Sequence, residues 1–86
     1  MKEIITSAGL SITLDEECFN DMELLQKLVT IEKGDLSALP EAVDLILGAE
    51  KGRFYESLRN EKGRVPIDAV VSEIRGIVDQ LGKRNF

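Results

Sequence analysis

The chain has 86 residues, of which 43% are hydrophobic and 31% charged, and its formal net charge is −5. This length suits a single small domain spanning residues 1–86, and the hydrophobic share is too high for a disordered chain. The acidic balance argues against a general nucleic-acid binder, and no apolar run approaches the roughly 18 residues that a membrane helix needs. One cysteine excludes an internal disulfide. The composition therefore predicts a cytoplasmic protein that binds neither nucleic acid nor membrane.

The charge is unevenly distributed along the chain. Residues 1–50 contain 11 acidic and 3 basic residues, a net charge of −8, whereas residues 51–86 contain 5 acidic and 8 basic residues, a net charge of +3. Two halves of opposite sign favour self-association, in which the acidic part of one subunit faces the basic part of another. Two solvated surfaces that merely differ in charge would give the same distribution.

The N-terminal residues predict a β-hairpin. The segment LSITL (10–14) alternates apolar and polar residues, and its β-branched side chains suit a half-buried strand. EIIT (3–6) is the expected partner strand across the glycine-containing turn at 7–9. Because an isolated hairpin is only marginally stable, it should pack on helices or pair with another chain.

Residues 20–34 predict the first helix. Asn20 or Asp21 can cap its start, and Gly34 can end it. We expect one apolar stripe along this helix, widened by Leu24 and Ile31. The stripe consists of Met22, Leu25, Leu28 and Val29.

Two further helices are expected at 37–48 and 49–60. Pro40 belongs to the first turn of the former, which has little polar surface and should be mostly buried. The latter should be anchored by Phe54, Tyr55 and Leu58. It contains Gly52, which implies either a helix that starts after Gly52 or a close approach by another backbone.

Residues 65–82 predict the last helix, with Pro66 in its first turn. Val71 and Val78 broaden its apolar stripe, and Glu73 is expected on the surface. Either the stripe packs on the chain's own core, or part of it binds a partner. The stripe residues are Ile67, Val70, Ile74, Ile77 and Leu81.

The residue inventory does not suggest an enzyme. There is no histidine, and Cys18 lies among acidic residues that raise the pKa of its thiol, so it is expected to be a small buried or half-buried apolar residue. Glu-Lys-Gly occurs at 32–34, 50–52 and 61–63 but fits no phosphate-binding pattern. We interpret the first and third copies as helix ends. No catalytic residue, cofactor site or metal site is predicted.

Two alternative functions remain open at this point. Small acidic helical proteins include acyl carrier proteins, and GDLSAL (34–39) places Asp35 and Ser37 near the position of the modified serine in that family, although in the order Asp-Leu-Ser. A helix-turn-helix regulator would fit the short helices, but the last helix offers only Arg75, with Lys83 and Arg84 following, to contact phosphates.

Four short features are spread over residues 20–78. They are the acidic helix opening at Asp21 to Leu25, the link at Ile31 to Pro40, the helix end at Ile46 to Gly48, and Gly-Arg-Val-Pro at Gly63 to Pro66. In these features the segment resembles the small tail assembly chaperones of long-tailed phages and Gram-positive prophages. Met22 stands where that family usually has an aromatic residue.

This resemblance implies a non-enzymatic role in the host cytoplasm. Proteins of this kind bind the tape measure protein, keep its apolar helical segments soluble, recruit tail tube subunits, and are absent from the mature virion. The expected fold is mainly α, with about four short helices packed as a small bundle and an N-terminal β-hairpin. The candidate partner-binding residues are Phe54, Tyr55, Ile67, Val70, Ile74, Ile77 and Leu81.

Overall fold

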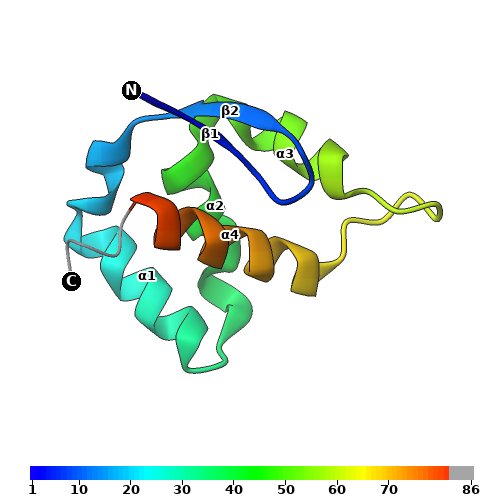
Figure 1. Cartoon of the computed structure of the whole chain (residues 1–86). Coiled ribbons are helices and arrows are strands. Elements are labelled where there is room, and N and C mark those ends of the chain that lie inside the picture. Colours follow the sequence, from blue (N-terminus) through cyan, green and yellow to red (C-terminus); the bar gives the residue numbers. More distant parts are fainter. Residues whose placement is uncertain (82–86) are drawn as a thin grey trace.

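The computed structural model describes residues 1–81 and has a helical body with a two-stranded sheet on one side (Figure 1). Strands β1 (Lys2–Ile5) and β2 (Ser11–Leu14) pair antiparallel, with Ile4 opposite Ile12. Successive side chains of a strand point to opposite faces of the sheet. Ile12 and Leu14 therefore lie on the buried face, while Ile5 lies on the other face and is 63% exposed. The predicted mainly helical fold with an N-terminal hairpin is confirmed.

The free edge of β2 is bound by the helical body. The backbone N–H of Thr13 donates to Glu50 Oε2 at 3.0 Å, and Arg53 Nη2 donates to the Ser11 carbonyl at 3.2 Å. Glu50 and Arg53 also form an ion pair of 2.8 Å. The Thr13 hydrogen bond, followed by the Arg53 contact, lowers the pKa of the Glu50 carboxyl. These contacts hold the hairpin against the segment before α3 and satisfy backbone groups that an edge strand leaves open.

Helix α1 (Met22–Glu32) follows a short 3₁₀ helix, η1 (Glu16–Phe19). Asp21 is its N-cap, and its carboxylate accepts from the Glu23 N–H at 2.9 Å, as the sequence predicts. The predicted apolar stripe is wrong in part. Met22 is 65% exposed and Val29 44% exposed, whereas Leu24 is one of the two buried residues of this helix.

The middle of the chain is one continuous helical segment rather than two separate helices. A 3₁₀ helix, η2 (Leu36–Ala38), leads into α2 (Leu39–Leu47), then η3 (Gly48–Glu50) and α3 (Lys51–Leu58) without a loop. The prediction of about four separate helices packed as a bundle is therefore wrong, because the two middle helices form one bent segment. The segment bends at Gly48, where φ is +51° and ψ is −121°, a conformation that favours glycine.

Helix α4 (Ile67–Leu81) closes the fold after a loop at 59–66. That loop is organised by Asn60, whose Oδ1 accepts from the N–H groups of Lys62 and Arg64 at 3.0 Å each. Gly63 has φ of +79° in the turn, four residues after the C-cap of α3 at Arg59, so the prediction that the third Glu-Lys-Gly copy ends a helix is wrong.

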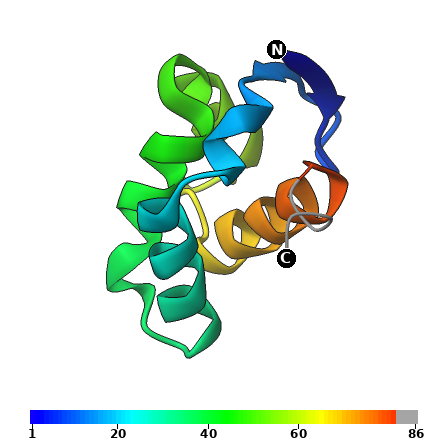
Figure 2. The ribbon, with the colours of Figure 1, turned by 90° about the vertical axis from the view of Figure 1, so that its left-hand side faces the viewer.

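The core lies between the inner face of the hairpin and helices α1, α2, α3 and α4, and α1 contributes Leu24 and Ile31 to it. Helices α1 and α4 both lie in the lower part of Figure 2, where they face each other. The prediction that Glu73 lies on the surface is wrong. Glu73 is only 7% exposed, and its Oε1 accepts a hydrogen bond from the Ser7 N–H at 3.1 Å. It joins α4 to the hairpin turn. The largest fully buried side chains are Phe54, Ile12, Leu14, Leu24, Ile77 and Val43.

Candidate partner-binding groove

The structure places most of the predicted contact residues in the core. Ile67 is 60% exposed and Tyr55 is half-buried, so these two side chains can reach a partner. The remaining five are buried in this conformation. Four of them belong to the α4 stripe, which therefore packs mainly on the chain's own core, the first of the two interpretations that the sequence leaves open. The buried residues are Phe54, Val70, Ile74, Ile77 and Leu81.

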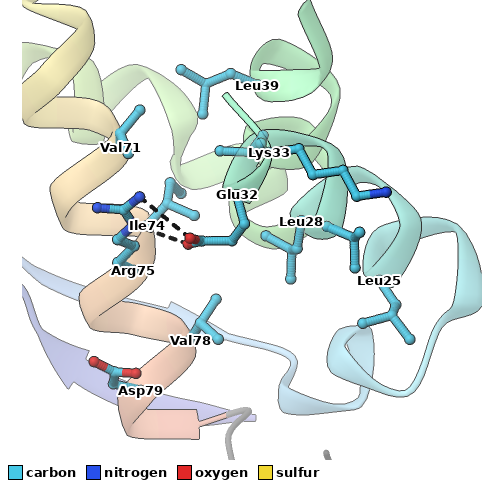
Figure 3. Close-up of a pocket in the computed structure, with 12 residues that line it drawn as sticks. Leu25, Leu28, Glu32, Lys33, Leu39, Val71, Ile74, Arg75, Val78 and Asp79 are labelled. Carbon is cyan, nitrogen blue, oxygen red and sulfur yellow. Dashed lines mark hydrogen bonds and ion pairs between the residues drawn. The ribbon is translucent and has the colours of Figure 1, made fainter. Parts of the chain in front are cut away.

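A groove of about 560 Å³ lies between α1 and α4, beside the start of α2 (Figure 3). Most of its surface is apolar. Ile74 is shared between this groove and the core. The lining residues are Leu25, Leu28, Val29, Ile31, Glu32, Lys33, Leu39, Val71, Ile74, Arg75, Val78 and Asp79.

Helical spacing explains why apolar side chains collect at this place. On α4, Val71, Ile74 and Val78 are separated by three and four residues, so they lie on one face. On α1, Leu25 and Leu28 are separated by three residues. Since both helices carry more apolar residues than the core can cover, each presents an extra apolar strip to the groove.

One ion pair joins the two sides of the groove. Arg75 Nε lies 3.0 Å from Glu32 Oε1, and Nη2 lies 3.4 Å from Oε2 (Figure 3). The side chains of Arg75 and Glu32 are 58% and 59% exposed. An ion pair this exposed is weak, because water screens both charges.

The groove is lined mainly by apolar side chains. Its lining contains no cysteine, serine, threonine or tyrosine, and its titratable groups are the paired Glu32 and Arg75 with Lys33 and Asp79. Within residues 1–81, no group of three His, Cys, Asp or Glu side chains could hold a metal ion. An apolar floor with charges along its sides is the surface that an amphipathic helix fits.

Cys18 belongs to η1 and lies outside the groove, half-buried against the core, as the sequence predicts. Burial, followed by the negative charges of Asp15 and Asp21, raises the pKa of the Cys18 thiol to about 11. At neutral pH the sulfur is therefore protonated and a poor nucleophile.

The residues behind the two alternative functions lie apart from the groove floor or are already engaged. Ser37 is exposed in η2, and its backbone N–H donates to Asp35 Oδ1 at 3.0 Å. Arg75, the cation expected to contact phosphates, is paired with Glu32. Lys83 and Arg84 lie outside the described residues.

The groove itself was not predicted from the sequence. A signal was present, since α1 contains more apolar residues than one core-facing stripe requires. Sequence periodicity alone cannot tell which of two adjacent apolar strips faces the core.

Comparisons of the chain with protein-family models, with curated proteins and with solved structures found no match. In the described part of the chain, no helix is both long enough and apolar enough to cross a membrane.

Proposed function

We propose that the protein is a phage tail assembly chaperone that binds the tape measure protein in the groove between α1 and α4. In this proposal it keeps apolar helical segments of the tape measure protein soluble, helps to recruit tail tube subunits and is absent from the mature virion. The observation that carries the proposal is an open apolar groove with charged sides in a domain of only 86 residues.

The geometry suits reversible capture. An amphipathic helix can place side chains at positions i, i+3 or i+4, and i+7 into a groove between two helices. Val71, Ile74 and Val78 on one side have this same spacing, so the apolar side chains of a bound helix can pack between them. Burying these side chains removes apolar surface from water on both partners, and release requires no bond to be broken.

The resemblance supports the identity of the partner, and the groove supports the mode of binding. A helix-turn-helix or acyl-carrier role gains less support, because Arg75 is paired with Glu32 and Ser37 does not line the groove. The uneven charge of the chain supports self-association as a further part of the proposal, with the tape measure protein as the main partner.

Co-expression with a candidate tape measure protein tests this function. We expect the tape measure protein to become soluble and to co-purify with the tagged chain, whereas expressed alone it should aggregate. A tape measure protein that remains insoluble with the chain present, in several candidate pairs from one tail gene cluster, would contradict the proposal.

A further inference from the structure

We infer that the groove binds its helical partner in one direction, with the partner's N-terminal end at Asp79 and its C-terminal end at Lys33. This inference rests on the proposed function, since it concerns the same groove. It adds the chemistry of the partner segment: an amphipathic helix with a basic residue near its N-terminal end and an acidic residue near its C-terminal end.

The length of the groove sets the length of the segment. Its lining runs from Leu25 on α1 to Lys33, the C-cap of that helix, and from Val71 to Asp79 on α4. Each stretch spans eight residue steps, or about 12 Å at 1.5 Å per residue. The groove therefore holds slightly more than two helical turns, which corresponds to three apolar anchors at i, i+3 or i+4, and i+7.

The two ends of the groove carry opposite charges. Figure 3 shows Asp79 at the end near Val78, and Lys33 at the other end, below Leu39, with its side chain directed away from α4. Both Lys33 and Asp79 are exposed, and neither forms an ion pair with another residue of the described range 1–81. Between them, Glu32 and Arg75 neutralise each other, so the end charges decide the polarity of the groove.

Helix dipoles add little at the Lys33 end of the groove. Lys33 follows the negative end of α1, and the positive end of α2 begins nearby at Leu39. These two dipole ends offset each other and leave the charge of Lys33.

A bound helix has a positive N-terminal end and a negative C-terminal end. It is attracted in the direction that places its N-terminal end at Asp79 and its C-terminal end at Lys33, and it is repelled in the reverse direction. A basic side chain in its first turn and an acidic side chain in its last turn would strengthen this preference. The bound helix would then run in the same direction as α1 and antiparallel to α4.

Two synthetic peptides test the direction. Both have the same composition, blocked termini, and leucines at i, i+3, i+4 and i+7; one has lysine first and glutamate last, and the other has these two residues exchanged. Their affinities are measured by fluorescence anisotropy for the wild-type protein and for the double variant Lys33→Glu, Asp79→Lys. We expect the wild type to bind the lysine-first peptide about three- to tenfold more tightly, and the double variant to prefer the other peptide.

The outcomes separate the inference from the function on which it rests. Equal affinity of the wild type for both peptides would overturn the direction and leave groove binding intact. Failure of the wild type to bind either peptide would overturn groove binding and, with it, the direction. The preference should also shrink as the salt concentration rises, because exposed charges are screened; a preference unchanged in high salt would contradict its electrostatic origin.

Discussion

Arg75 and Glu32 lie opposite each other across the groove and are joined by two nitrogen–oxygen contacts of 3.0 and 3.4 Å (Figure 3). Arg75 belongs to α4 and Glu32 is the last residue of α1, so the pair links the two helices that form the groove. Since more than half of each side chain is exposed, the pair contributes little to the stability of the fold.

Replacing Glu32 with Gln therefore has little effect on folding. We expect the free energy of unfolding to change by less than about 1 kcal/mol in a urea titration, because exposed ion pairs rarely contribute more. Lys27→Gln is the matched control, since Lys27 pairs with Glu41 at 3.6 Å across a different helix boundary. A loss of several kcal/mol in Glu32→Gln alone would show that the pair holds the fold together.

Glu73 behaves differently because it is buried and binds the hairpin turn. Glu73→Ala removes the acceptor of the Ser7 N–H and is expected to lower the free energy of unfolding by about 1–2 kcal/mol. Glu73→Gln retains an oxygen acceptor and should lose less. Thermal and urea unfolding of both variants check this order, and equal losses in the two would argue against the hydrogen bond as the cause.

Glu-Lys-Gly-Arg occurs twice, at 50–53 and 61–64, and the two copies provide a comparison within one chain. Gly52 lies in the first turn of α3, and a Cβ added there would meet no atom within 4 Å. Neither of the two explanations offered by the sequence, a helix start after Gly52 or a close backbone approach, is correct. Gly52→Ala should be neutral or stabilise by up to about 1 kcal/mol.

Gly63→Ala is the counterpart of that substitution. The φ of +79° at Gly63 is unfavourable for alanine, so we expect a loss of about 1–2 kcal/mol although the space around Gly63 is open. Urea unfolding of the two variants side by side measures the difference. If both substitutions had the same effect, the two copies would have the same structural role.

The thiol of Cys18 gives a pH-dependent readout. Because its pKa is raised to about 11, the folded state holds the thiol proton up to high pH, and alkylation should accelerate only as pH approaches that value. Iodoacetamide labelling followed by mass spectrometry measures the midpoint. Asp21→Asn keeps a helix N-cap and removes one negative charge, so its midpoint should fall slightly. A wild-type midpoint near 8.5, as in an unperturbed thiol, would contradict this environment.

The sequence is sufficient to predict the local elements but not how their surfaces are used. The hairpin and the N-cap at Asp21 follow from short-range patterns, and both are confirmed. Short-range patterns do not predict which face of α1 is buried, because its apolar residues occupy two adjacent strips. Contacts with the rest of the fold bury Leu24 and Ile31.

Longer-range contacts explain the other differences. The burial of Glu73 depends on Ser7, 66 positions earlier in the chain, and no local pattern encodes that contact. The groove likewise requires α1 and α4 to lie apart at a distance that only the whole fold fixes. Ile74 illustrates the consequence, since it was predicted to bind a partner but is 3% exposed, so Ile74→Asp should unfold the domain.

The most direct test of groove binding compares two exposed apolar residues, one inside the groove and one outside it. Val29 lines the groove and is 44% exposed, whereas Ile67 is 60% exposed and does not line it. Val29→Asp and Ile67→Asp should both fold, as circular dichroism can verify. In a pull-down of the tape measure protein, we predict that Ile67→Asp retains wild-type recovery and that Val29→Asp loses most of it. Wild-type recovery by Val29→Asp would contradict binding in this groove.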